Sequence, residues 1–133
     1  MRYVLALTIA LLLNAGANLL MKMGMKSVAA SGGLLNGGIA GAVKSVMTNT
    51  SLVVGLTCFA LNAAFYMYAL QSKALKISIA YPVMVGGGYA LIAAAARLHP
   101  ALAERLTWGQ MVGVGLVFAG IILIAAQTDA AGA

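Results

Sequence analysis

Four long apolar runs organise this chain, and the segments between them hold its lysines and arginines. A helix needs about 20 apolar residues to cross the hydrocarbon core of a membrane. On this criterion we predict membrane-spanning helices over residues 3–21, 51–70, 77–96 and 108–126. One long connection, roughly 25–50, two shorter ones and a short tail make up the rest, so we expect residues 1–133 to form a single four-helix transmembrane domain.

The first apolar run also has a second interpretation. Arg2, the run itself and the small residues Ala15, Gly16 and Ala17 match the pattern of a secretory signal peptide. The run continues beyond these small residues to Met21. That continuation favours a spanning helix and leaves the signal peptide as the alternative.

The connection between the first two runs carries a weaker pattern. Four apolar residues recur in it at a spacing of four: Leu35, Ile39, Val43 and Met47. Asn36 and Lys44 lie off this stripe, which predicts a short amphipathic helix at the membrane interface, with a flexible loop as the alternative. Three glycines share the same spacing, which suggests a face for close packing on another helix: Gly33, Gly37 and Gly41.

Composition indicates that lipid surrounds these helices. Of 133 residues, 63% are hydrophobic and 8% are charged, whereas a typical soluble domain has about 45–50% and about 25%. The net charge of +6 comes from basic residues near the ends of the apolar runs. That placement favours contact with anionic lipid head groups over nucleic acid.

The chain lacks the residues of an enzyme active site. It has one cysteine, Cys58, one histidine, His99, and two acidic residues. No Ser/His/Asp, Cys/His or metal-binding cluster can be built from that set. We therefore predict no catalytic residues, no metal site and no cofactor.

Polar side chains inside the apolar runs fall on shared helix faces. Seven do so at spacings of four or eight residues: Asn14, Asn18 and Lys22; Asn62 and Tyr66; Tyr81 and Tyr89. A polar group in hydrocarbon costs free energy unless it has a partner. These residues therefore predict either a cavity that binds a polar head group, with Lys22 toward a phosphate, or hydrogen bonds between packed helices. Both interpretations stay open at this point.

The last two apolar runs contain proline and glycine residues that can bend a helix or let it pack closely on another. In the third, Pro82 removes a backbone hydrogen bond just before Gly86, Gly87 and Gly88, which predicts a hinge, with close helix packing as a second role. In the fourth, three glycines are spaced for a packing face, which suggests a dimer contact: Gly109, Gly113 and Gly120.

Several short motifs follow one another in a specific order. They are NAGANLLMK at 14–22, IAYP at 79–82 with Gly86 and Gly88, and ERL at 104–106 with Gly113 and Gly120. Each is weak by itself, but together they resemble the small multidrug resistance family of the drug/metabolite transporter superfamily. The resemblance covers nearly all of the chain. It implies a multi-pass protein of the bacterial inner membrane that works as a dimer.

Two departures separate the chain from the drug exporters of that family. These exporters carry an essential Glu in the first helix and a Trp in the third, and the matching positions here are Asn14 and Met84. An amide does not titrate, so it cannot exchange protons for a substrate. None of the four runs contains Asp or Glu, because Glu104 and Asp129 lie outside them. The family's Tyr in the third helix is retained as Tyr81.

The chain is more similar to a related branch, the four-helix subunits that flip undecaprenyl-phosphate-linked aminoarabinose. That branch shares the approach to the third helix seen here as Leu70-Gln71 through Ile79-Ala80-Tyr81-Pro82. The resemblance implies a flippase of a lipid-linked sugar or lipid-phosphate amphiphile that works by alternating access. We expect a homodimer or a heterodimer with a paralogue, with membrane lipids as further partners. The substrate-binding residues are then Asn14, Asn18, Lys22, Asn62, Tyr66, Tyr81, Met84 and Tyr89.

Two other functions stay open. One is an exporter of a small molecule such as a cationic drug, polyamine or metabolite, with a carboxylate supplied by Glu104 or by a partner. The other is an accessory subunit that transports nothing and stabilises a larger membrane complex.

Overall fold

The computed structural model describes residues 1–73, 75–98 and 107–130. Within these ranges the chain forms five helices: α1 (Arg2–Ala30), α2 (Gly38–Thr48), α3 (Thr50–Ala69), α4 (Ile77–Leu98) and α5 (Trp108–Ala130). The connection with His99 and Glu104 lies outside the described residues. Among those that are described, α1, α3 and α4 are long and apolar enough to cross a membrane, and α5 adds a shorter apolar stretch, Trp108–Ile124. The predicted fold class, all-α with four transmembrane helices and a short helix after the first, is confirmed.

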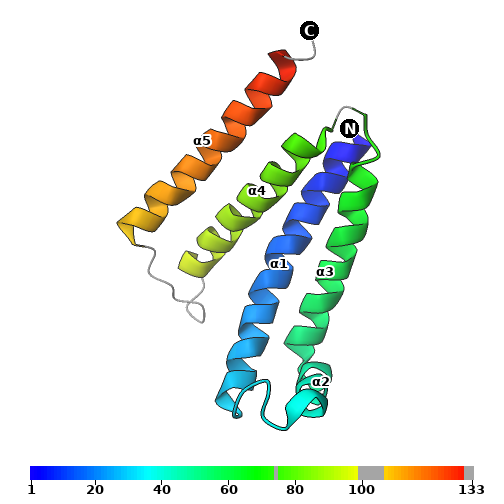
Figure 1. Cartoon of the computed structure of the whole chain (residues 1–133), viewed down its shortest axis with the longest axis vertical. Helices are drawn as coiled ribbons and strands as arrows, with labels where there is room; N and C mark the ends of the chain where they lie inside the picture. Colours follow the sequence, from blue (N-terminus) through cyan, green and yellow to red (C-terminus); the bar gives the residue numbers. More distant parts are fainter. Residues whose placement is uncertain (74, 99–106, 131–133) are drawn as a thin grey trace.

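The long helices stand in a row rather than in a closed bundle. α1 packs between α3 and α4, and α5 packs on the outer side of α4 (Figure 1). The first helix is therefore central to the packing. Ala15 and Ala17, which also fit a signal-peptide cleavage site, are buried within it.

Small residues allow α1 and α3 to approach closely. Ala10 and Ala17 of α1 are fully buried. At Gly55 of α3, an added Cβ atom would lie 3.2 Å from both the backbone oxygen of Ala17 and the backbone nitrogen of Met21. The two backbones are thus separated by less than the thickness of a side chain, which is how helices associate inside a membrane.

The first helix extends well beyond its predicted end at residue 21. It has 29 residues and ends at Ala30, which makes it about 44 Å long, against about 30 Å for the hydrocarbon core. Lys22 ends the apolar run but not the helix, because the following residues pack on the start of α3. Gly24 and Val28 are buried there, and a Cβ atom at Gly24 would lie 2.6 Å from Leu52 Cγ.

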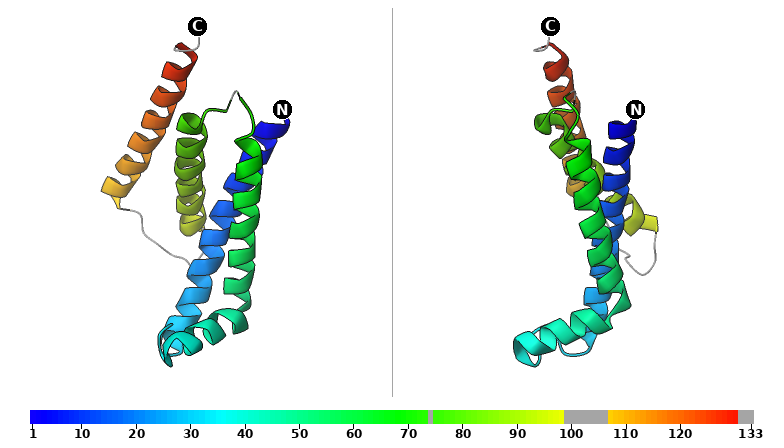
Figure 2. Two further views of the ribbon diagram at one scale, coloured as in Figure 1. Left: turned by 45° about the vertical axis from the view of Figure 1, so that its right-hand side comes forward. Right: turned by 90° about the vertical axis from the view of Figure 1, so that its right-hand side faces the viewer.

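The second helix confirms the short helix predicted from the stripe, and it runs across the ends of α1 and α3 rather than along them (Figure 2). The predicted glycine face is wrong. Gly33 and Gly37 lie in the turn before α2, with φ values of 93° and 102° that favour glycine. Of that set, Gly41 is inside the helix, where an added Cβ would lie 2.6 Å from the backbone oxygen of Asn36.

Candidate functional site

The polar stripe of α1 begins with two asparagines that contact each other. Asn18 Nδ2 donates hydrogen bonds to the backbone oxygen of Asn14, at 2.8 Å, and to Asn14 Oδ1, at 3.3 Å. Asn14 is half-buried, whereas Asn18 and Lys22 are exposed. The stripe thus leads from the interior of the helix row at Asn14 to the surface at Lys22.

Asn14 also contacts the neighbouring transmembrane helix. A Cβ atom at Gly88 of α4 would lie 2.9 Å from Asn14 Nδ2. The amide of Asn14 therefore lies against the α4 backbone at a position where any larger residue would displace it. This neighbour is not evident from the sequence, because the two residues lie 74 positions apart.

On α3, two predicted residues face the interior without a hydrogen-bond partner. Asn62 is 4% exposed. Within the described part of the chain, neither Asn62 Oδ1 nor the Tyr66 hydroxyl has a partner. Burying such groups without a partner costs roughly 1–3 kcal/mol each. The α1–α3 interface therefore contains two polar groups that are available to a bound polar molecule or water.

The spacing along α3 shows which part of α1 lies near Asn62. Gly55, Asn62 and Ala69 recur every seven residues and so share one helix face. Gly55 contacts Ala17 and Met21, and Ala69 clusters with Ala6 and Leu7. Asn62 thus faces the middle of α1, the part that contains Asn14.

The two tyrosines of α4 lie at the surface. Tyr81 and Tyr89 are both exposed, and Met84 is half-buried. Of the predicted site residues, Asn62 is buried and Asn14, Tyr66 and Met84 are half-buried, whereas the other four are exposed in the single chain: Asn18, Lys22, Tyr81 and Tyr89.

The three consecutive glycines of α4 contact two different helices. A Cβ at Gly86 would collide with Ile121 Cδ1 and would lie 3.2 Å from Val117 Cγ1, both on α5. A Cβ at Gly87 would lie 2.5 Å from Leu11 Cδ1 of α1. These contacts match the close packing expected as a second role of the glycine run. The hinge stays a prediction.

The predicted dimer glycines of α5 lie on open surface. Among the described residues, nothing lies within 4 Å of a Cβ built at Gly109, Gly113 or Gly120. The contact with α4 instead uses Val117 and Ile121. The glycine positions are therefore available for a second chain, and their role in a dimer stays a prediction.

A further structural residue, Asn49, is not among the predicted ones. Its Oδ1 accepts a hydrogen bond from the backbone nitrogen of Leu52 at 3.2 Å, which caps α3. Its Nδ2 donates to the backbone oxygen of Gly24 at 3.4 Å and joins α3 to α1. An Asn just before an apolar run is a sequence signal for a helix N-cap, but the contact with Gly24 has no such signal.

Known proteins resemble the chain over most of its length. It is 34% identical over 114 residues to the probable 4-amino-4-deoxy-L-arabinose-phosphoundecaprenol flippase subunit ArnF of Enterobacter sp. strain 638, covering 85% of this chain and 86% of that protein. It is 32% identical over 84 residues to the quaternary ammonium compound-resistance protein QacF of Klebsiella aerogenes, covering 62% and 74%. The chain belongs to the small multidrug resistance family.

Within this family its sequence lies in the branch of the ArnF-type subunits. A second such subunit, from Erwinia tasmaniensis, is 36% identical over 78 residues, which is 59% of each chain. No family model matches the chain, and no solved structure matches it. As a member of the small multidrug resistance family, the protein is a multi-pass membrane transporter of the bacterial inner membrane and not an enzyme.

Proposed function

We propose that this protein flips a lipid-linked sugar or lipid-phosphate amphiphile across the inner membrane by alternating access. One observation carries the proposal: the buried Asn62 and the half-buried Tyr66 each have a buried polar atom without a partner in the described part of the chain. An exporter that exchanges protons for cations needs a carboxylate in its path, and the four apolar runs contain none. An amide and a phenol instead suit the hydroxyl groups of a sugar, because each can both donate and accept hydrogen bonds.

The polar stripe of α1 is the proposed path of the head group. Asn14 and Asn18 offer amides along the helix, and Lys22 stands where the apolar run ends. A lysine ammonium binds phosphate as a point charge. In this proposal the lipid chain stays in the hydrocarbon while the head group moves between these side chains and Tyr66, Tyr81 and Tyr89.

A second subunit completes the path. Asn18, Lys22 and Tyr89 are exposed in the single chain, and exposed polar groups at membrane depth need protein or water beside them. A homodimer, or a heterodimer with a paralogue, would place another polar surface opposite them. The relatives' name, flippase subunit, is consistent with such a partnership.

Pro82 and the glycines of α4 are the proposed hinge. Pro82 lies inside α4, so one hydrogen bond of the helix is missing at that point. Because Gly86 contacts α5 and Gly87 contacts α1, bending of α4 there changes the position of both neighbours. The hinge would thereby expose the path first to one side of the membrane and then to the other.

A second candidate function is export of a small organic cation. The similarity to the quaternary ammonium compound-resistance protein favours it. One residue argues against this function. Asn14 occupies the position of the exporters' essential Glu, and its amide has neither a negative charge to attract a cation nor a proton to exchange for one.

The deciding experiment measures flipping of a fluorescent polyprenyl-phosphate-linked sugar in proteoliposomes. We expect the Asn18→Leu and Lys22→Leu variants to lose most of this activity while they keep the wild-type oligomeric state. Thr57→Leu is the matched control, because Thr57 is an exposed polar residue of α3 whose hydroxyl bonds to its own helix at Val53. Full activity of both variants in a folded protein would show that the proposed path is wrong.

A further inference from the structure

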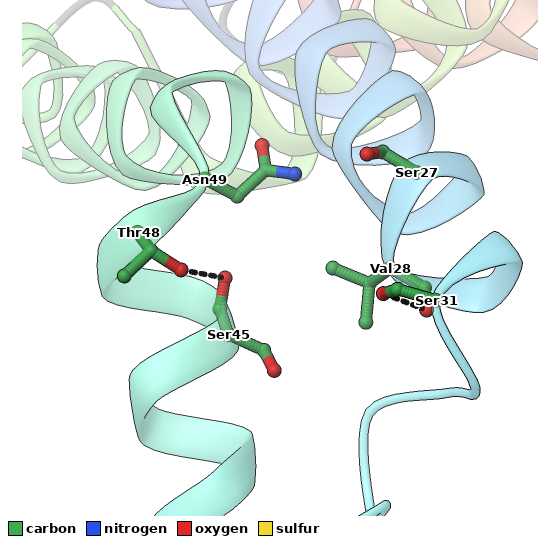
Figure 3. Close-up of a pocket in the computed structure, with 6 residues that line it drawn as sticks. All are labelled: Ser27, Val28, Ser31, Ser45, Thr48 and Asn49. Atoms are coloured by element: carbon green, nitrogen blue, oxygen red, sulfur yellow. Dashed lines mark hydrogen bonds between the residues drawn. The ribbon is translucent and has the colours of Figure 1, made fainter.

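A polar pocket lies where α1, α2 and α3 meet, apart from the proposed path. Its volume is about 260 Å³, and it is lined by Ser27, Val28, Ser31, Ser45, Thr48 and Asn49. Ser27 and Ser31 of α1 stand on one side, and Ser45, Thr48 and Asn49 stand on the other (Figure 3). Five of its six lining residues therefore carry a hydroxyl or an amide.

This pocket lies on the flank of α1 away from the asparagines. Ser27 follows Asn18 by nine positions, which is about two and a half helical turns and points the two side chains in opposite directions. Its residues are thus separate from Asn14, Asn18 and Asn62. A ligand of this pocket would bind whether or not the proposed transport function holds.

The depth of the pocket is that of lipid head groups. The apolar run of α1 ends at Lys22, Ser27 lies in the last turn of the helix, and Ser31 follows directly after its end. On the other side, Asn49 caps the beginning of the apolar helix α3. Both walls therefore lie just beyond the ends of apolar spans, where the hydrocarbon gives way to the interface.

The chemistry of the walls suits a ligand with hydroxyl groups. The Ser31 hydroxyl donates to the backbone oxygen of Val28 at 2.9 Å, and the Thr48 hydroxyl donates to that of Lys44 at 2.8 Å. Both hydroxyl protons are thereby used, and the two oxygens remain as acceptors. At Ser31 and Thr48 a ligand therefore finds hydrogen-bond acceptors, which suit its own hydroxyl groups.

The exposed side of α2 faces away from the pocket and places this helix at the lipid boundary, because Ser45 of the pocket lies about half a turn from Val43 and Met47. Ile39, Val43 and Met47 are 83%, 58% and 68% exposed. The opposite side of the helix, at Gly41, is covered by the backbone of Asn36. An apolar helix face of this kind at the end of membrane spans is stable when it lies on acyl chains at the lipid boundary.

The charge around the pocket is positive. Lys26 precedes Ser27 on α1, and Lys44 precedes Ser45 on α2, and both lysines are exposed. The sequence has no Asp or Glu between Met1 and Leu98. An anionic head group is therefore attracted here more strongly than a zwitterionic one.

We propose that the pocket binds the head group of one membrane lipid, an anionic phospholipid with a hydroxylated head group. Its hydroxyl groups enter the pocket between Ser27 and Ser45 and reach the oxygens of Ser31 and Thr48. The phosphate lies near Lys26 and Lys44. The lipid holds α2 at the interface and joins it to the end of α1.

The test uses native mass spectrometry of the full-length protein titrated with phosphatidylglycerol in detergent. We expect the wild type to retain about one tightly bound phosphatidylglycerol per chain and to bind phosphatidylethanolamine more weakly. The double variant Ser27→Ala/Ser45→Ala should bind phosphatidylglycerol roughly five-fold more weakly or worse. Neither of these hydroxyls caps a helix, so the fold should remain intact, and circular dichroism checks this.

Two matched variants separate this site from general lipid contact. Ser72→Ala/Ser78→Ala removes two hydroxyls at the other end of the helix row and should leave the affinity unchanged. Val54→Ser, at an exposed valine of α3, should leave the affinity unchanged as well. Wild-type affinity in Ser27→Ala/Ser45→Ala would overturn the proposal, and equal affinity for phosphatidylethanolamine and phosphatidylglycerol would overturn the assignment of an anionic lipid.

Discussion

At the scale of single residues, the buried amide of Asn62 is a position where a substitution should change transport activity without lowering stability. A side chain that only stabilises the fold would have its polar atoms paired, and Asn62 Oδ1 has no partner among the described residues. We expect Asn62→Leu to leave the protein as stable as the wild type, or more stable by up to about 1–3 kcal/mol, while flipping activity falls at least ten-fold. Thermal unfolding in detergent and the proteoliposome assay measure the two effects.

Tyr66→Phe is the more conservative companion of this variant. It removes the unpartnered hydroxyl and keeps the ring that packs on Ala6, Leu7 and Ala80. The same separation of stability from activity is expected. A marked loss of stability in either variant would mean that the polar atom bonds to a neighbouring helix or subunit, as in the packing interpretation of these residues.

At the scale of elements, the α1–α3 pair depends on the absence of a side chain at Gly55. A methyl group there would meet the backbone of α1 at Ala17 and Met21, and a backbone cannot rotate away as a side chain can. We expect Gly55→Ala to destabilise the protein by about 1–3 kcal/mol and to lower its thermal midpoint in detergent. This is the substitution in the transmembrane helices whose effect on packing is most direct.

The control for this prediction is Gly16→Ala, on α1 itself. Nothing lies within 4 Å of a Cβ built at Gly16, so the added methyl meets no neighbour. Alanine is the better helix former by roughly 0.5–1 kcal/mol, and the variant should be as stable as the wild type or slightly more so. Equal thermal midpoints for the two variants would show that α1 and α3 are not in close contact at Gly55.

Hydrophobic patterning predicts the transmembrane helices well, because a segment that crosses the hydrocarbon of a membrane must be an apolar helix of spanning length. The starts of α4 and α5 agree with the sequence, and the start of α3 differs by one residue. The predicted end of α1, at residue 21, does not agree with the structure. The apolar run stops before Lys22, whereas the helix continues to Ala30, with Gly24 and Val28 buried in its last turns. The turn at Gly33 and Gly37 was missed because a four-residue spacing fits a helix as well as a glycine-rich turn.

The sequence predicts only part of the candidate site, namely which of its residues share a face of one helix. Helical periodicity places Asn14 with Asn18, and Asn62 with Tyr66, since residues four apart share a face. Contacts between helices are not encoded in any such period. The approach of Gly88 to Asn14, and that of Asn49 to Gly24, depend on how the helices cross. These contacts become visible in the structure and leave no pattern in the sequence.

At the scale of the whole molecule, the open row of helices is the basis for the proposed second chain. The glycines at 109, 113 and 120 lie close together around α5 and have no neighbour in the single chain. We expect Gly113→Leu to shift the purified protein from dimer to monomer in light scattering after gel filtration. Gly115→Leu is the matched control, because Gly115 is equally open and faces the other side of α5. Dissociation of both variants, or of neither, would show that the dimer contact is elsewhere.

The charge distribution of the whole molecule bears on its energy source. Its two acidic residues, Glu104 and Asp129, both lie outside the apolar runs, and the position where related exporters have Glu is Asn14. A transporter without a carboxylate in its path lacks the group that would exchange a proton for its substrate. We expect flipping in proteoliposomes to leave the internal pH, reported by a trapped dye, unchanged. Asn14→Glu should introduce a dependence of flipping on pH, because a carboxyl at that position titrates. Proton movement in step with transport by the wild-type protein would contradict this prediction and favour the small-molecule exporter, with Glu104 or a partner supplying the carboxylate.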